Sequence, residues 1–510
     1  MRDAGILVAL VVASTTVATF ANRWRIPAPS VLVLVGLGVA LLPGVPAVRI
    51  TPEAISLVVL PPLLYASAQD ISARELRTIW RPLLALAFGL VLATAFAVGG
   101  LSVWVTSLGT PMAFVLGTVL ASTDPVAVTA LGRRLPLPPR IQALVQSESL
   151  FNDATSLVLF QVAVGVAAGS GTVHWAAAGG RFVVLAGGGM AVGAALSVLV
   201  VALRSRAADP LLHTVIALVT PYAAYLLAQG AGVSGVTAVV VAGVAVASAG
   251  PRMTDARTRL QVHAVYGVLV FLLESVVFAL IGLGLPTLVR DLPPGSQWWP
   301  VQAGVLAAAL IVVRLAWMRP TVVHAGPTRA YPPWPVTRVM TWAGTRGVMP
   351  LAAALSIPLT ATDGTVLADR PLALVLTTAV VAVTLTVQGL TLAFVVRSSG
   401  LAVDPAHVAS KEAQVRAWLD EAALEYLENL RDNDDVPGEV LDRLERRYNA
   451  RLGRTEDGTW PHADFARLQR RLLDVQRAEL RRLHTDGRVD DGVQRRITHE
   501  LDRTEEGLIR

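Results

Sequence analysis

Long apolar runs are the feature that most limits how this 510-residue chain can fold. About thirteen hydrophobic segments precede residue 400, and 54% of all residues are hydrophobic. Their approximate cores are 4–22, 29–43, 51–68, 82–106, 111–131, 140–168, 178–203, 211–228, 234–250, 260–288, 299–318, 335–359 and 371–397. A helix needs about 20 apolar residues to cross a bilayer, whereas membrane barrels are built from short alternating strands. We therefore predict an all-α polytopic membrane protein with about 13 transmembrane helices.

The distribution of arginine predicts how these segments are oriented. Groups of arginines follow the first, third, fifth, seventh, ninth and eleventh segments, whereas the intervening loops hold them singly. Because basic residues are enriched in cytoplasmic loops, we expect the N-terminus outside the plasma membrane and the C-terminus in the cytoplasm. An odd number of spans requires the same arrangement. A secretory signal is the alternative for residues 5–20, but their leader carries no net positive charge, so we expect a first membrane helix.

The composition changes after residue 400. Residues 401–510 hold 24 acidic and 19 basic residues, whereas the preceding part holds 13 acidic and 24 basic residues. Apolar residues recur there at helical spacing, as at Val415, Leu419 and Tyr426. We predict a transmembrane domain at 1–400 and a cytoplasmic helical domain at 401–510. We expect the second domain to serve packing or dimer contacts, and regulation by a bound partner or ion is the alternative.

Carboxylates inside an apolar segment are the strongest functional signal. The stretch QSESLFNDATSLVLF, residues 146–160, contains Glu148, Asn152 and Asp153. On a helix Ser149 and Asp153 share one face, and Glu148 and Asn152 share the next. A carboxylate buried in a membrane is costly and usually functional, and carboxylate and hydroxyl oxygens suit a hard cation. We predict an ion site here; the structural alternative is an ion pair that only locks helices together.

Two segments carry interruptions. In ASTDPVAV, residues 121–128, Asp124 precedes a proline, which is the pattern of a helix N-terminus in the middle of a membrane segment. In GTRGVMP, residues 344–350, glycines and a proline interrupt the twelfth segment. A matching pair of interrupted helices is typical of inverted-repeat transporters. The structural alternative for Asp124 is a helix cap whose only role is to satisfy backbone N–H groups.

Arg346 places a permanent positive charge in the second interruption. We expect Arg346 to pair with Glu148 and to leave Asp153 able to exchange a proton. The alternative is an arginine that extends to the membrane surface, which its central position in the segment disfavours.

Five motifs together resemble the sodium/proton exchanger branch of the monovalent cation/proton antiporters, over residues 5–400. They are STDPVAV, ESLFNDATSLVLF, GTRGVMPLAAAL and TVQGLTL, with LPPLLYASA as weaker support. The resemblance implies inverted six-helix repeats, two crossing broken helices, a homodimer and an elevator-like movement. It also implies Na⁺ ligands at the Thr123 carbonyl, Ser149 and Asp153, with Glu148 acting through water, Asp124 at the crossing, Asn152 orienting the site, and Arg346 pairing with Glu148 and Asn152.

The Asn152–Asp153 pair bears on stoichiometry, because the related electrogenic branch has Asp where Asn152 stands. One exchangeable carboxylate can hold either a proton or a cation, so we expect electroneutral exchange of Na⁺, or Li⁺ or K⁺, for H⁺ in pH and sodium homeostasis. A potassium-preferring antiporter, a transporter-derived membrane sensor and an ion channel are the alternatives. We expect no enzyme activity, no cofactor and no nucleic acid partner.

Glu274, in FLLESVVFALIGLGLP, is a further acid in an apolar segment. Other members of the family often carry Asn at this position. We expect a structural or tuning role.

Overall fold

The computed structural model describes the chain with gaps, and its residues fall into two units, 1–403 and 404–510. The described residues are 11–17, 19–21, 28–42, 55–69, 71, 73–124, 137–169, 175–207, 209–249, 256–293, 295–324, 331–361 and 363–403, followed by 406, 410, 421–422, 424–429, 438, 441–442, 445–446, 448–449 and 482.

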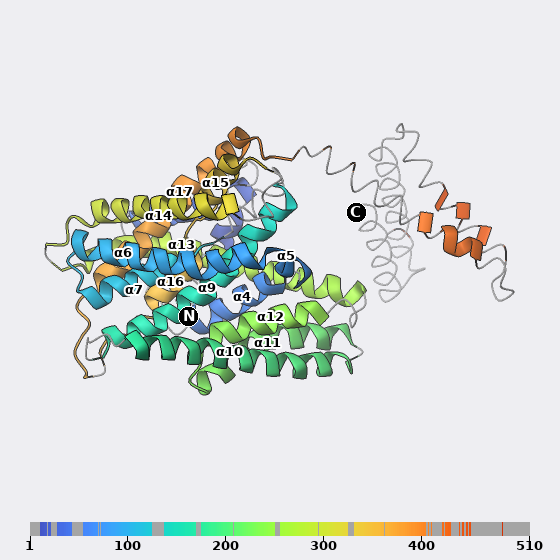
Figure 1. Ribbon diagram of the computed structural model, residues 1–510, viewed down its shortest axis with the longest axis horizontal. Coiled ribbons are helices and arrows are strands. Elements are labelled where there is room, and N and C mark those ends of the chain that lie inside the picture. Colours follow the sequence, from blue (N-terminus) through green and yellow to red (C-terminus); the bar gives the residue numbers. More distant parts are fainter. Residues whose placement is uncertain are drawn as a thin grey trace. The chain divides into compact units, whose positions relative to one another are not determined.

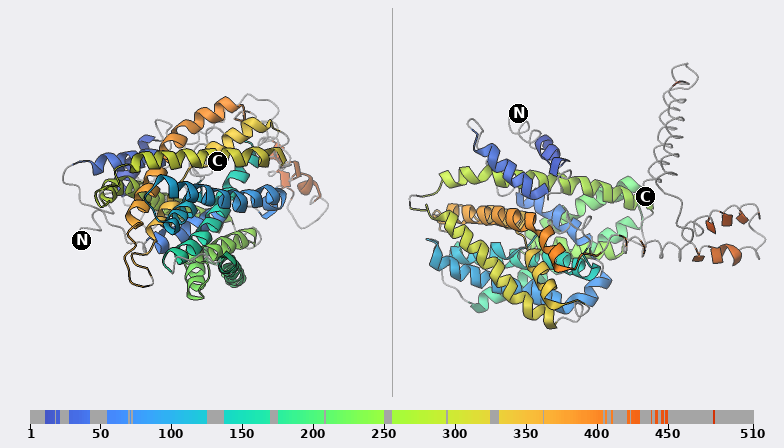
Figure 2. Two further views of the ribbon diagram at one scale, coloured as in Figure 1. Left: turned by 60° about the vertical axis from the view of Figure 1, so that its left-hand side comes forward. Right: turned by 90° about the horizontal axis from the view of Figure 1, so that it is seen from above.

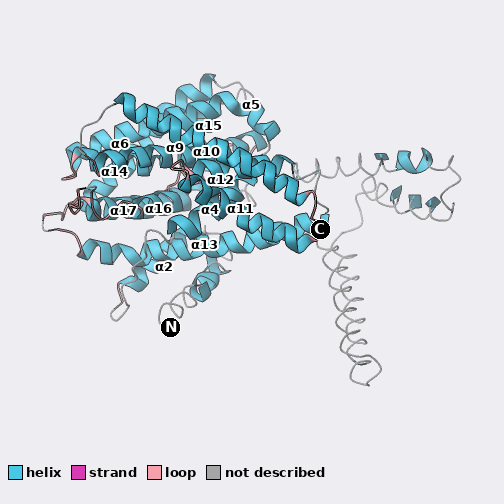
Figure 3. Cartoon of the chain, turned by 90° about the horizontal axis from the view of Figure 1, so that it is seen from below, coloured by secondary structure: helices cyan, strands magenta, loops and turns pink. Residues whose placement is uncertain are grey.

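Helices make up nearly all the regular structure in these ranges (Figure 3). They are α2 (Ala28–Ala40), η1 (Ile55–Val59), α4 (Leu60–Gln69), α5 (Ala73–Leu84), η2 (Ala85–Leu90), α6 (Val91–Val105), α7 (Thr110–Ala121), α9 (Pro139–Ala167), α10 (Trp175–Arg204), α11 (Pro210–Gly230), α12 (Gly235–Ala249), α13 (Ala256–Arg290), α14 (Trp299–His324), α15 (Pro333–Trp342), α16 (Val348–Leu355) and α17 (Arg370–Ser399). The β-type pairing within the described ranges is limited to two isolated bridges, Asp124 with Thr345 and Thr360 with Val366. The predicted all-α class is confirmed.

Seven stretches are long and apolar enough to cross a membrane. They are Ile79–Val105, Arg140–Ala167, Ala176–Arg204, Pro210–Gly230, Thr258–Arg290, Trp299–Val322 and Arg370–Ser399. Shorter apolar helices are Val11–Ala21, Ala28–Ala40, Leu57–Gln69, Thr110–Ala121 and Gly235–Ala249. By length and composition, the chain is a polytopic helical membrane protein, as predicted.

The helices of the first unit pack mainly within two groups (Figure 1). The α13 group comprises α2, α4 and α10–α13, and α2 lies along α13 (Figure 2). The α9 group comprises α6, α7, α9 and α14–α17. Membrane helices approach closely through small residues: a side chain added at Gly282 of α13 would meet the backbone of Val33 and Gly36 in α2, and one at Gly117 of α7 would meet α6.

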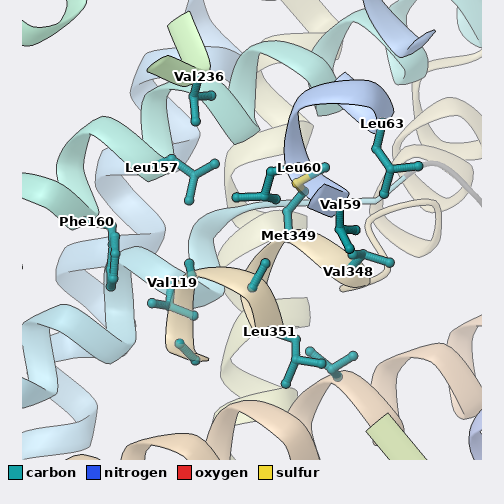
Figure 4. Close-up of a cluster of buried hydrophobic side chains, with 14 of the residues drawn as sticks. Val59, Leu60, Leu63, Val119, Leu157, Phe160, Val236, Val348, Met349 and Leu351 are labelled. Atoms are coloured by element: carbon teal, nitrogen blue, oxygen red, sulfur yellow. The ribbon is translucent and has the colours of Figure 1, made fainter. Parts of the chain in front are cut away.

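An apolar cluster lies where the two groups meet (Figure 4). Val59, Leu60, Leu63 and Val236 come from the α13 group and η1. Val119, Leu157, Phe160, Val348, Met349 and Leu351 come from α7, α9 and α16. All are buried, so the contact between the groups is a hydrophobic one next to α9.

The second unit is described only in short helical pieces. Leu427 and Leu441 are buried, whereas Tyr426, predicted on the same apolar face, is 65% exposed. Val415 and Leu419 lie outside the described residues. The helical domain at 401–510 therefore stays a prediction.

Candidate ion-binding site

The two predicted interruptions meet in space. Helix α7 ends at Ala121 and Ser122 is extended, while the segment between α15 and α16 covers residues 343–347. The Asp124 backbone N–H donates to the Thr345 carbonyl at 2.8 Å, and the Thr345 hydroxyl donates to the Asp124 carbonyl at 2.7 Å. Backbone groups that a helix break leaves open are thus satisfied by the other break. The half-helix predicted after Asp124 lies outside the described residues.

Asp124 was expected to cap a helix in its own segment. The cap contact in the described residues is instead with α16, in the other broken segment. Its carboxylate accepts from the backbone N–H of Val348, the first residue of α16, at 3.2 Å. A carboxylate at a helix N-terminus satisfies an open donor and complements the helix dipole. A side chain at Gly347 would overlap this carboxylate, so glycine is needed for the close approach.

One face of α9 is bound to the end of α7. The Ser149 hydroxyl donates to the Thr123 carbonyl at 2.6 Å, and the Ser122 hydroxyl donates to the Asp153 carboxylate. One turn further on, Ser156 donates to the Thr118 carbonyl at 2.8 Å. The structure therefore gathers Thr123, Ser149 and Asp153, the three expected ligands, at the end of α7, and Asp153 is only 6% exposed.

Glu148 is paired with an arginine that sequence reasoning missed. Nη1 and Nη2 of Arg314, in α14, lie 2.6 and 2.9 Å from the two carboxylate oxygens of Glu148. Asn152 donates from its amide nitrogen to Glu148 and to the Thr123 hydroxyl, both at 3.1 Å. Asn152 thus links Glu148 to the end of α7, which is consistent with an orienting role.

The expected pairing of Arg346 with Glu148 and Asn152 is not formed. Nη1 of Arg346 instead donates to the carbonyl oxygens of Ala121 and Ser122, at 3.3 and 2.6 Å. A cation at a helix C-terminus complements the helix dipole, so the last open carbonyls of α7 provide the favourable environment that a carboxylate was expected to provide.

Arg314 carried a signal in the sequence. It is one arginine inside the apolar segment 299–318, where an intramembrane cation needs a partner. Its Nε donates to the Met340 carbonyl at 2.9 Å, and a side chain at Gly344 would meet its guanidinium. These contacts fix the guanidinium between α14 and the second broken segment.

The acids of α9 therefore differ in their partners. Glu148 has a bidentate arginine, whereas Asp153 has a hydroxyl donor and no ion pair with any described residue.

Glu274 lies in the middle of α13, is partly exposed, and forms no hydrogen bond or ion pair in the described part of the chain. The searched residues hold no His/Cys/Asp/Glu cluster of the kind that binds a transition metal. The chemistry on offer is that of carboxylate, hydroxyl and carbonyl oxygens, which bind a hard cation or a proton.

Comparisons with known proteins agree with this geometry. A family model described as "Sodium/hydrogen exchanger, transmembrane" matches residues 7–398. Rv2287 of Mycobacterium tuberculosis, named as an uncharacterized Na(+)/H(+) exchanger, is 35% identical over 528 residues, which cover 99% of this chain and 96% of the relative. A sodium, potassium, lithium and rubidium/H(+) antiporter of Bacillus pumilus is 31% identical over 399 residues, covering 74% of this chain and 59% of the relative.

A solved structure shares the fold. The sodium proton antiporter MjNhaP1 from Methanocaldococcus jannaschii matches with a TM-score of 0.64 at 19% identity, covering 78% of this chain and 99% of that chain. With the family model matching most of the sequence and one relative aligned over nearly all of it, the chain belongs to the transmembrane sodium/hydrogen exchanger family, whose members are transporters.

Proposed function

We propose that this protein is a secondary antiporter that exchanges Na⁺, or Li⁺ or K⁺, for H⁺ across the plasma membrane, in pH and sodium homeostasis. One observation carries the proposal. Asp153 is a buried carboxylate that forms no direct ion pair with a described residue, and it lies beside neutral oxygen donors. Such a group is unfavourable when charged and alone, so it takes up either a proton or a cation.

Sharing one carboxylate sets the stoichiometry. Glu148 is held by Arg314, so its charge is already balanced, and Asn152 carries none. A proton and a monovalent cation then compete for Asp153, and each must leave before the other binds. We therefore expect one proton per cation and no net charge moved. The Thr123 carbonyl and the Ser149 hydroxyl are the proposed further ligands, with Glu148 acting through water.

The long-range architecture belongs to the same proposal. We count the seven long spans, the five shorter apolar helices and the α15–α16 pair as thirteen crossings, and this odd number puts the two termini on opposite sides of the membrane. The distribution of arginine favours the N-terminus outside and the C-terminus in the cytoplasm. Inverted repeats, a homodimer and an elevator-like movement of the α9 group against the α13 group complete the proposal. The apolar cluster between these groups supports the movement, because apolar side chains can slide without exchanging hydrogen bonds. The movement would have to break a buried contact between the groups, in which the Ser30 hydroxyl of α2 donates to the Leu385 carbonyl of α17 at 2.7 Å.

The proposal is tested in inside-out vesicles acidified by respiration. A ΔpH dye should report collapse of the gradient on addition of NaCl with the native chain and no collapse with Asp153→Asn. LiCl and KCl additions rank the cations, and the potassium-preferring alternative holds if KCl is the most effective. The cations that the name of the Bacillus pumilus relative includes are a reason to test K⁺.

Two controls separate the remaining alternatives. Electroneutral exchange predicts that clamping the membrane potential with valinomycin and K⁺ leaves the initial Na⁺-driven rate unchanged, whereas a net current would rule out the one-for-one exchange. A chain shortened after residue 403 should still transport. If the shortened chain does not transport while the full chain does, the second unit is part of the transport machinery. That result would favour the alternative of a sensor with an output domain.

A further inference from the structure

We propose that Glu274 sets the affinity of the transport route for its cation, as an unpaired negative charge on α13 that faces the crossing of the broken helices. The inference rests on the proposed antiport function. It assigns to Glu274 an electrostatic role for monovalent cations in general, distinct from direct ligation at Asp153.

Among the described residues, the helices around Glu274 offer no cation to pair with it. Helix α13 packs against α2, α4, α11, α16 and α17. Helices α2, α4 and α16 contain no charged residue, and α17 has arginines only at its ends, Arg370 and Arg397. The titratable groups on these elements are Tyr65 in α4 and His213, Tyr222 and Tyr225 in α11. His213 is bound to the Ala207 carbonyl at the end of α11.

Its own helix and the first helix add no partner either. The other charged residues of α13 are near its ends: Arg257, Arg259, His263 and Arg290. The helix at 11–21 reaches α13 beside Glu274, where the Ser14 hydroxyl donates to the Ser275 carbonyl at 3.4 Å, and this helix has no charged side chain. A structural ion pair, the ordinary explanation for an acid in a membrane segment, is therefore not formed in the described part of the chain.

Glu274 is also more accessible than the acids of α9. It is partly exposed, whereas Asp153 and Glu148 are buried. A carboxylate in the middle of a spanning helix faces the bundle interior or a hydrated path, because lipid gives it no solvation. Phe278, four residues further along the same face of α13, is fully buried, so Glu274 lies on the interior side of this helix.

The position of Glu274 connects it with the ion site. Asp124 lies at the N-terminus of α16, and α16 packs against α13, the helix that carries Glu274. Around the crossing, Arg314 pairs with Glu148, and Arg346 binds the carbonyls of Ala121 and Ser122. When Glu274 is ionised, its charge adds to that of Asp153 and favours cations near the site.

The test is the dependence of the initial exchange rate on Na⁺ concentration at a fixed pH of about 9, so that the carboxyl group is ionised, in vesicles with the native chain, Glu274→Gln and Glu274→Asp. We expect Glu274→Gln to raise the KM for Na⁺ about threefold or more. Removing a unit negative charge from a protein interior weakens the attraction for a nearby cation, and therefore lowers its affinity. The kcat should change less than about twofold on the same argument, and Glu274→Asp, which keeps the charge, should keep a KM near the native value.

Two further readouts distinguish charge from packing. A charge effect raises the KM for Li⁺ and K⁺ by a factor similar to that for Na⁺, whereas loss of a geometric ligand changes the ratios between cations. The matched control is Asp363→Asn in an exposed loop. Hydrogen bonds from Thr365 hold the pKa of Asp363 below its usual range, so this control also removes a real negative charge, and it should leave the KM unchanged.

The outcomes are separable. Unchanged KM values in Glu274→Gln, with native exchange intact and Asp153→Asn inactive, overturn the inference and leave the antiport function standing. An altered cation ratio also overturns it, in favour of direct ligation. Failure of the native chain to respond to any cation contradicts the proposed function itself. If Glu274→Gln does not reach the membrane, Glu274→Asn gives the same charge removal and the same criterion.

Discussion

The two interrupted segments are alike in form but opposite in the charge that they contribute. The first ends helix α7 and contributes Asp124, and the second precedes helix α16 and contributes Arg346. Asp124 binds the N-terminal N–H of α16, in the second segment, and Arg346 binds the C-terminal carbonyls of α7, in the first. Each break is therefore completed by a charge from the other.

This exchange of partners explains how two broken helices can be stable in a membrane. Helix ends leave backbone donors and acceptors that lipid cannot satisfy, and the sign of each charge matches the helix end that it binds. The ion pair of the site is formed elsewhere, between Glu148 in α9 and Arg314 in α14.

Breaking the Glu148–Arg314 pair is expected to have the largest effect on stability. Arg314→Ala leaves the Glu148 carboxylate buried without a counter-charge, which costs about 3–5 kcal/mol. Thermal unfolding of the detergent-solubilised protein should show a strongly lowered midpoint. The matched control is the double change Arg314→Met with Glu148→Gln, which removes both charges and should recover most of the loss. A double variant as unstable as the single one would contradict the assignment.

Removal of the Arg346 charge is expected to have the second largest effect. Arg346→Gln takes a charged donor from the Ala121 and Ser122 carbonyls, and a hydrogen bond to a charged group is worth about 1.5–3 kcal/mol. Arg346→Lys keeps the charge at the end of α7 and should lie between the native and Gln variants in unfolding midpoint. If Glu148→Gln destabilises the native chain and the Arg346→Gln variant equally, no direct ion pair joins Arg346 and Glu148, as the contacts predict. A strong coupling in this cycle would restore the pairing expected from the sequence.

The architecture around the site could be predicted from the sequence because it depends on local patterns. Apolar length predicts the spanning helices, and Gly–Thr–Arg–Gly and Asp–Pro interrupt them in ways that helices rarely tolerate. The face shared by Ser149 and Asp153 follows from helical geometry alone. These predictions required no knowledge of which segments are neighbours.

The partners of the charges could not be predicted in the same way. Arg314 and Arg346 both lie within apolar segments, and which of them reaches Glu148 depends on how α14 is rotated against α9. That rotation is set by close contacts such as Gly344 against the Arg314 side chain, which connect segments distant in sequence. The role of Asp124 as a cap for α16 could not be predicted for the same reason. The proline after Asp124 indicates a helix start only within its own segment.

The smallest expected effect concerns Asp124, and it compares the two breaks most directly. Asp124→Ala removes the cap of α16, and the loss of an N-cap costs about 0.5–2 kcal/mol. Asp124→Asn keeps an acceptor for the Val348 N–H and should cost less, since only the charge is lost. The measurement is again the unfolding midpoint, beside Arg346→Gln. Because Asp124 contributes one accepted backbone bond and Arg346 a charged donor to two carbonyls, the loss in Asp124→Ala should be the smaller of the two. The opposite order would mean that the N-terminus of α16, rather than the C-terminus of α7, is the more costly helix end to leave open at the crossing.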